Sequence, residues 1–219
     1  MTDVRIASVD QRLDRPGLLA ASLGLVRRAV GVGLLADRAP IEVLDLGLLQ
    51  EIAREAASAG VGRDAAAALV ASGGRPPARL EAIISRLDGA IVDSPMPERE
   101  IHGLLGVYEH DGLAALTGTS VASLRRYAAG TRTVPDALAA RIHFVALVTS
   151  DLAGSYNAFG LRRWWDRPRT PLGGRSPRAV LGRDWSPDGP AAVAVAELAA
   201  ALAGDTSVSL AATADGAVR

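Results

Sequence analysis

The residues best suited to do chemistry lie between Leu113 and Pro135, where the chain reads LAALTGTSVASLRRYAAGTRTVP. Successive residues of a helix are rotated by about 100°, so a helix beginning at Val121 turns Ala122 and Arg126 to the same side. An exposed arginine can donate to guanine O6 and N7 or to a phosphate, and an alanine methyl can contact a thymine methyl. This segment is therefore expected to contact double-stranded DNA.

The predicted DNA-contacting set comes from the turn, the second helix and the loop after it. Hydroxyl and guanidinium groups at its edges suit phosphate contacts, which position a protein on the duplex without reading its sequence. The set consists of Thr119, Ser120, Ala122, Ser123, Arg125, Arg126 and Arg132. The alternative is a fold that only packs, because two outward positions of the helix are alanine and the local charge is neutral.

The elements that must position these residues form a helix-turn-helix. A first short helix is expected over residues 112–117, followed by Gly118 at a turn where positive φ is easiest for glycine. Ser120 supplies an N-cap oxygen to a second helix over residues 121–129, and Gly130 ends that helix. The inward residues of the second helix are predicted to be Val121, Leu124 and Ala128, with Tyr127 on the flank.

A second candidate surface lies downstream, around Trp164 and Trp165. Adjacent residues of a helix point about 100° apart, so at most one of the two can be centred in a core. The other is expected to be partly exposed among arginines, a composition typical of a protein–protein hot spot. Those arginines are Arg162, Arg163, Arg167 and Arg169. The alternative is that both tryptophans cover a small core, with Gly173-Gly174 as an ordinary turn.

Together the two segments resemble the Xre/MbcA/ParS-type antitoxins. The resemblance rests on the helix-turn-helix, on residues 160–168 (GLRRWWDRP) and on residues 172–177 (LGGRSP), and covers about half of the chain. In that family a helix-turn-helix domain is joined to a small helical toxin-binding domain. The resemblance implies that the chain neutralises a RES-domain toxin, which degrades NAD, and represses its own operon. It also implies a toxin-binding set of Arg162, Trp164, Trp165, Arg167, Arg169, Leu172, Gly173, Gly174, Arg175 and Pro177.

Composition narrows the other possibilities. Alanine dominates an apolar content of 49%, and aromatic residues make up 4%, a mixture that favours helix over sheet. The absence of cysteine excludes disulfides and thiolate metal sites. The 24 arginines balance 24 acidic residues, but residues 151–190 hold seven arginines against four acids. The basic excess therefore lies downstream of the helix-turn-helix.

Several kinds of site are not expected. The three histidines (His102, His110 and His143) lack metal-ligand spacing and are predicted to lie on helix surfaces or flanks. No nucleophile–base pair can be proposed, so neither an enzyme nor a cofactor is expected. The longest apolar stretch, residues 17–26, is too short to span a bilayer, and the N-terminus does not resemble a signal peptide. A cytoplasmic protein without a membrane segment follows.

The pattern predicts an all-α protein whose regions meet at Pro95 and near Ser155. These regions are an N-terminal helical region of unknown role (1–95), the helix-turn-helix domain (96–155), a toxin-binding-like domain (156–204) and a flexible tail (205–219). Thr133 is expected to begin a capping box for a helix that reaches about Gly154. The other expected helices cover residues 41–58, 79–87, 97–108 and 190–203, the last stopped by Gly204.

Three functional hypotheses follow. In the first, the chain is the antitoxin of a type II toxin–antitoxin system, binding operator DNA as a homodimer because one short recognition helix gives little affinity. In the second, it is a stand-alone transcription regulator whose C-terminal half dimerises. In the third, it is an interaction scaffold whose helix-turn-helix no longer binds DNA.

Overall fold

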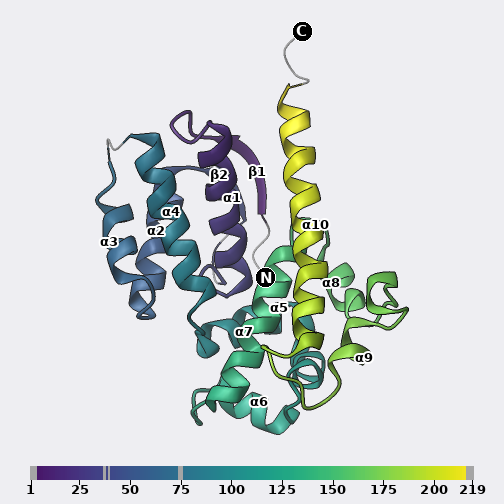
Figure 1. Cartoon of the computed structure of the whole chain (residues 1–219). Coiled ribbons are helices and arrows are strands. Elements are labelled where there is room, and N and C mark those ends of the chain that lie inside the picture. The colour runs from purple at the N-terminus through teal and green to yellow at the C-terminus, as the bar shows by residue number, and fades with distance from the viewer. Residues whose placement is uncertain (1–3, 37, 39, 74–75, 216–219) are drawn as a thin grey trace.

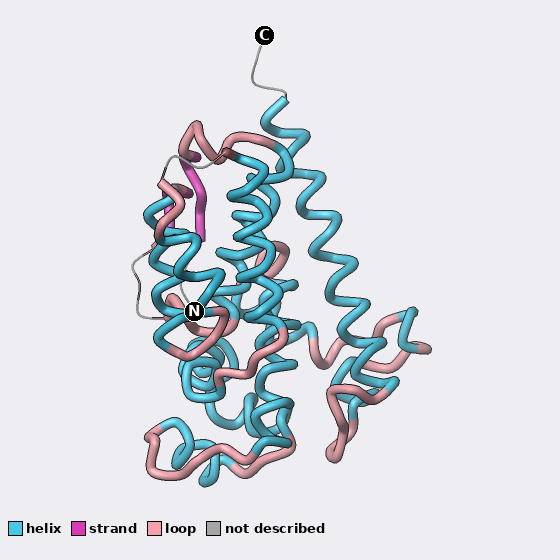
Figure 2. Tube along the Cα trace, turned by 60° about the vertical axis from the view of Figure 1, so that its left-hand side comes forward, coloured by secondary structure: helices cyan, strands magenta, loops and turns pink. Residues whose placement is uncertain are grey.

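The computed structural model describes residues 4–36, 38, 40–73 and 76–215, with side chains described as far as residue 203. Helices dominate this part of the chain, as the composition predicted. The all-α prediction is nevertheless incomplete, because two short strands pair beside the first helices. Figure 2 shows these strands on one side of the molecule and the long C-terminal helix running along the other.

The first layer comprises four helices. They are α1 (Pro16–Gly31), α2 (Leu46–Ser58), α3 (Arg63–Val70) and α4 (Pro77–Val92). Helix α1 packs on α4, and α3 packs on both α2 and α4 (Figure 1). The predicted helix at 79–87 is confirmed within α4, whose inward face is formed by Leu80, Ile83, Ile84, Leu87 and Ile91.

The two strands, β1 (Val4–Val9) and β2 (Ile41–Leu44), form a parallel pair. The sequence suggested a helix from Ile41 because five apolar residues between Val43 and Ala56 fall on roughly one helical face. In the structure residues 41–44 form a strand instead, in which Ile41 and Leu44 are buried and Val43 is exposed. Helix α2 begins only after Asp45, whose side chain accepts from the backbone N–H of Leu48 at 2.8 Å. The predicted helix over 41–58 is therefore wrong at its start.

The middle of the chain holds α5 (Pro97–Thr117), α6 (Val121–Ala128) and α7 (Asp136–Leu152). Glu109, with φ of 58° and ψ of 178°, interrupts α5, so the expected pair of helices on either side of it is confirmed. The predicted Thr133 capping box is wrong, because Pro135 is the N-cap of α7 and no side chain caps this helix. Proline at that position fixes φ near the value that a helix start requires.

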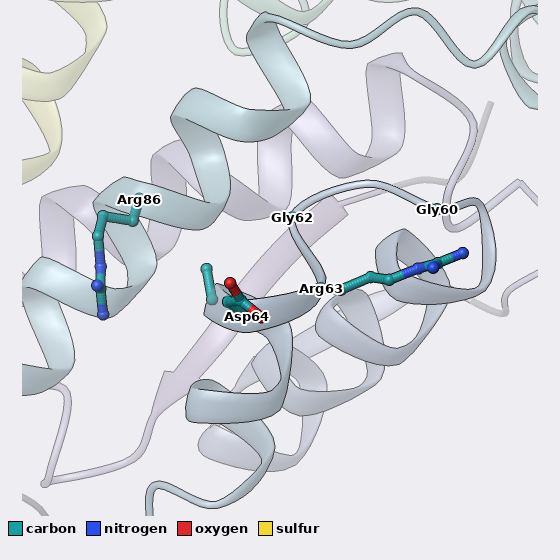
Figure 3. A pocket seen from close by; sticks show the side chains of 6 residues that line it. Gly60, Gly62, Arg63, Asp64 and Arg86 are labelled. Carbon is teal, nitrogen blue, oxygen red and sulfur yellow. The ribbon is translucent and has the colours of Figure 1, made fainter.

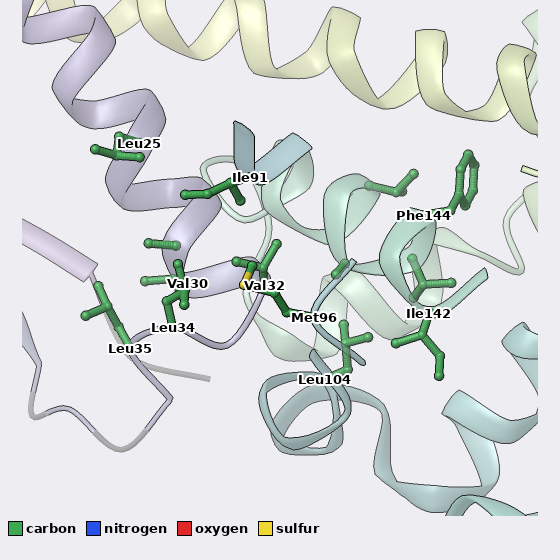
Figure 4. Close-up of a cluster of buried hydrophobic side chains, with 14 of the residues drawn as sticks. Leu25, Val30, Val32, Leu34, Leu35, Ile91, Met96, Leu104, Ile142 and Phe144 are labelled. Atoms are coloured by element: carbon green, nitrogen blue, oxygen red, sulfur yellow. The ribbon is translucent and has the colours of Figure 1, made fainter. Parts of the chain in front are cut away.

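Helix α7 is central, since it packs against α1, α5 and α10. Its buried residues occur on most of its circumference, as expected for a helix enclosed by others. One cluster of buried apolar side chains runs from α1 through Met96 to α5 and α7 without a break (Figure 4). The proposed division at residue 95 thus falls within continuous packing, and it stays a prediction.

The C-terminal part contains α8 (Ala158–Trp164), the short 3-10 helix η1 (Thr170–Leu172), α9 (Pro177–Leu181) and α10 (Pro190–Asp215). Helix α10 packs against α7, α9 and η1. It continues through Gly204 to Asp215, so the predicted stop at Gly204 is wrong; residues 216–219 of the expected tail lie outside the described residues. None of the helices within the described ranges combines the length and apolar character needed to cross a bilayer.

Candidate functional site

The turn between α5 and α6 has the geometry that the sequence predicted. Gly118 adopts φ of 72° and ψ of 20°, and the Thr119 N–H donates to the Ala114 carbonyl at 3.1 Å. The Ser120 hydroxyl then accepts from the backbone N–H of Ser123 at 3.1 Å, which caps α6. Glycine also follows α6, where Gly130 has φ of 65°. Two helices and a tight turn are therefore specified locally.

Helix α6 offers one free face. Leu124 and Tyr127 are its buried residues, whereas Ala128, expected to point inward, is exposed. The guanidinium carbon of Arg132 lies 5.5 Å from the Tyr127 ring centroid, so this arginine covers the ring from outside. Among the predicted DNA-contacting residues, Ser120, Ala122, Arg125, Arg126 and Arg132 are exposed, and Thr119 and Ser123 are half-buried.

Residues distant in sequence fix the α5–α6 turn by contacts to its backbone. The indole N–H of Trp185 donates to the Leu116 carbonyl at 3.0 Å, and Arg141 on α7 donates to the Thr117 carbonyl at 3.3 Å. A Cβ atom at Gly118 would lie 2.7 Å from the carbonyl oxygen of Arg183. Contacts this close leave the turn no room for a side chain. The position of α6 is thus set by Arg141 and by residues that follow the tryptophan pair.

The exposure predicted for one of the adjacent tryptophans is wrong. Trp164 and Trp165 are both 0% exposed, with ring centroids 5.1 Å apart and planes at 89°. The Trp165 indole N–H donates to the Tyr108 hydroxyl at 3.0 Å, and that hydroxyl lies 2.8 Å from Oγ1 of Thr149. Helix α8 packs on α5 and ends at Trp164, and the chain that follows brings Arg169 against the Trp164 ring, so different segments cover the two diverging rings. Neither ring is available as an exposed hot spot.

The other predicted toxin-binding residues divide by exposure. Arg162, Arg167, Gly173, Gly174 and Arg175 are exposed, Arg169 is half-buried, and Leu172 and Pro177 are buried. Arg162 donates to the Val107 carbonyl at 2.9 Å, and Arg175 donates to the Ala179 carbonyl. The exposed members therefore form a basic, glycine-containing surface between α8 and α9.

This surface is built on a closed loop, residues 169–175. The backbone N–H of Arg169 donates to the Arg175 carbonyl at 3.0 Å, and the Gly174 N–H donates back to the Arg169 carbonyl at 3.0 Å. Gly173 and Gly174 have φ of 66° and 76°, values that glycine adopts without strain. Ser176 caps α9 by accepting from the Ala179 N–H at 3.3 Å. The LGGRSP segment is thus a turn followed by a capped helix.

One histidine is not where the sequence placed it. His143 is 7% exposed on α7, with Nδ1 2.5 Å from Oε1 of Glu100, itself fully buried. Its Nε2 donates to the Val92 carbonyl at 2.8 Å. Burial raises the pKa of Glu100. For His143 burial acts to lower the pKa, but the hydrogen bond and charge of Glu100 outweigh it and the pKa is raised. Helical spacing alone could not reveal a pair 43 residues apart.

Two other kinds of site, a metal centre and a ligand pocket, can be compared with these surfaces within the described residues. No three histidine, aspartate or glutamate side chains among them are grouped to hold a metal ion. A shallow pocket of about 370 Å³ lies beside the start of α3, lined by Gly60, Gly62, Arg63, Asp64, Ala65 and Arg86. Figure 3 shows Arg63 directed away from Asp64 and Arg86, so its charged groups do not converge.

Comparison of the chain with protein-family models, with curated proteins and with solved structures found no match. The resemblance to antitoxins therefore rests on the motif residues.

Proposed function

We propose that the chain is an antitoxin-like regulator that binds operator DNA through α6 and a protein partner through the surface between α8 and α9. The observation that carries the proposal is the α5–α6 unit. Its glycine turn, its serine N-cap and its exposed face with Arg125 and Arg126 together match what a helix-turn-helix needs to enter a major groove.

In this proposal α6 is the recognition helix. Its exposed N-terminal half carries Ser120 and Ala122, and Arg126 lies one turn further along. Arg126 donates to guanine or phosphate, and Thr119, Ser120 and Arg132 contact the backbone of the duplex. A helix of eight residues makes few contacts, so a homodimer on two half-sites supplies the affinity.

The buried tryptophans change how the partner surface works. Since Trp164 and Trp165 are enclosed, they support the loop at 169–175 and do not insert into the partner. The exposed arginines make the surface contacts to the partner, and Gly173 and Gly174 allow close backbone approach. Arginine suits this role because its planar guanidinium can bind a carboxylate with two hydrogen bonds. The proposed partner is a RES-type toxin encoded next to this chain, bound in the cytoplasm.

Electrophoretic mobility shift with the DNA upstream of the coding sequence tests the first half. Arg126→Ala is expected to weaken binding and to flatten its salt dependence slightly, because one cationic contact is lost. Arg86→Ala, which removes an exposed arginine of α4, is the matched control and should bind like the wild type. If the wild-type chain shifts none of this DNA, alone or with its partner, the DNA-binding proposal fails.

Co-expression with the adjacent reading frames tests the second half. The partner should co-purify with the wild-type chain and lose its toxicity in the complex. A chain that shifts the upstream DNA but captures no neighbouring product would instead support the stand-alone regulator.

A further inference from the structure

Three donor atoms lie unpaired where Arg169, the first residue of the 169–175 loop, contacts Trp164. Among the side chains that the structure describes, four buried polar atoms lack a hydrogen-bond partner, and one of them is Oε2 of Glu100. The other three are Nε1 of Trp164 and Nε and Nη2 of Arg169. The guanidinium carbon of Arg169 lies 5.5 Å from the Trp164 ring centroid, so the three donors belong to a single pair of side chains.

Such a cluster calls for an acceptor. Buried donors are nearly always satisfied in proteins, because an unmade hydrogen bond forfeits the one that the group made with water. The face of the Trp164 ring stabilises the positive charge of Arg169. This contact gives the indole N–H of Trp164 no acceptor. By comparison, Trp165 and Trp185 both donate to protein oxygens at 3.0 Å. Trp164 differs from the other two tryptophans in this respect.

The acceptor is best supplied from outside the chain. The nearby carboxylate of Asp166 is engaged by Arg178, with Nε to Oδ1 at 2.7 Å. Most residues of the 169–175 loop are exposed, and a Cβ atom added at Gly173 or Gly174 would meet nothing within 4 Å. Arg169 is itself only half-buried, so the Arg169 end of the pair lies close to the surface.

The chemistry of the donors favours a carboxylate. Nε and Nη2 form the side-on fork of a guanidinium, which matches the two oxygens of a carboxylate group. A neutral acceptor would leave the charge of Arg169 without a counter-ion. The exposed side chains around the loop include Arg162, Arg167 and Arg175, whose field attracts an acidic group.

We propose that Trp164 and Arg169 form a seat for an aspartate or glutamate side chain of the partner protein. The assignment of the carboxylate to a partner rests on the function proposed above. The seat itself is a property of this chain and can be tested without the partner.

The first test uses the full chain alone, labelled with nitrogen-15, and follows its three indole N–H signals by NMR. Acetate is the probe, and chloride at equal ionic strength is the control. The Trp164 signal should move with acetate and not with chloride, while the Trp165 and Trp185 signals stay in place. Arg169→Lys, which keeps the charge but lacks the fork, and Arg169→Gln should abolish the movement. Arg167→Gln, an equal charge loss at an exposed site, should preserve it. A Trp164 signal that acetate leaves unmoved in the wild type overturns the seat.

The second test uses the complex with the protein encoded by the neighbouring gene. Arg169→Lys should weaken the complex about tenfold or more, as expected for a buried charge-assisted hydrogen bond, and Arg167→Gln should weaken it less. Equal affinity of Arg169→Lys and wild type, with an unmoved Trp164 signal in the complex, would assign the seat to a small carboxylate and overturn the partner assignment. If no complex forms at all, the proposed function fails, and the acetate titration still decides whether the seat exists.

Discussion

His143 and Glu100 are hydrogen-bonded in the interior, with Nδ1 and Oε1 2.5 Å apart. The carbonyl of Val92 can only accept, so Nε2 of His143 carries a hydrogen, and the second proton lies between the ring and the carboxyl group. Val92 ends α4, Glu100 lies in the first turn of α5 and His143 lies on α7. One polar group therefore ties the N-terminal layer to the two helices behind α6.

This pair should make stability depend on pH. The pKa values of both groups are raised, so the folded chain keeps protons that the unfolded chain releases, from Glu100 above pH 4.5 and from His143 above pH 6.5. The stabilisation that His143 contributes is fully present below pH 6.5 and is lost as pH rises through its raised pKa. The charges of Arg28, which lowers the pKa of His143, and Glu98, which raises that of Glu100, act on the same pair.

Urea unfolding between pH 6 and 9 measures this effect. The free energy of unfolding of the wild type should fall with pH, by at most about 1.4 kcal/mol per unit for one proton. His143→Gln, which still carries an amide donor but does not titrate, should show a flatter profile. Equal slopes for the two proteins would contradict the raised pKa of His143.

Tyr108→Phe should destabilise the fold by about 2 kcal/mol, because it leaves the Trp165 N–H buried without its acceptor. The Thr149 hydroxyl is affected less, since it also donates to the Val145 carbonyl at 2.7 Å. Denaturant unfolding followed by tryptophan fluorescence gives the value. Tyr156→Phe, at a half-buried tyrosine, is the control and should cost less than half as much.

Gly118→Ala should cost more than Gly130→Ala, although both glycines have positive φ. The shared left-handed backbone costs about 1–2 kcal/mol in a non-glycine residue. At Gly118 a Cβ would also lie 2.7 Å from the Arg183 carbonyl oxygen, whereas Gly130 has nothing within 4 Å. We expect a total of about 3 kcal/mol or more at Gly118, measured by thermal unfolding. Similar losses at the two sites would mean that residues 183–185 do not hold the turn.

Substitutions at Ser120 separate its two roles. Ser120→Ala should cost about 1 kcal/mol through the lost N-cap of α6. Ser120→Asp should retain stability, since aspartate caps as well as serine, but its charge should weaken operator binding several-fold by repelling phosphate. Parallel unfolding and mobility-shift measurements distinguish the roles. Unchanged DNA binding by Ser120→Asp would place Ser120 outside the interface.

Residues 96–219 expressed alone should fail to unfold cooperatively. Helix α7 would lose its cover from α1, including the contact of Arg28 with Asp151 at 3.7 Å and the bond from His143 to Val92. Binding of a hydrophobic dye and a broad urea transition are the expected signs. A sharp transition in this fragment would show that the boundary at residue 95 separates independent domains.

The parts of the fold that could be predicted from sequence are those set by local geometry. Gly118, Ser120 and Gly130 act on their immediate neighbours, so their spacing located both ends of α6. The burial of Trp165 depends on Tyr108, 57 residues away, and that of His143 on Glu100, 43 residues away. Helical periodicity contains no information about such pairs. Strand β1 could not be predicted for another reason: five of its six residues are exposed, so it has no buried face for an alternating apolar pattern to mark.

The turn before α6 and the segment after the tryptophan pair are fitted to each other, through Trp185 on Leu116 and Arg183 against Gly118. The helix-turn-helix and the segment after the tryptophan pair can therefore not be exchanged independently of each other. A chimera that replaced α5 and α6 would need glycine at position 118 and a carbonyl at position 116 that can accept from Trp185, or residues 183–185 would lose their contacts as well. Each motif therefore constrains the other, and the two are expected to change together among descendants of this chain.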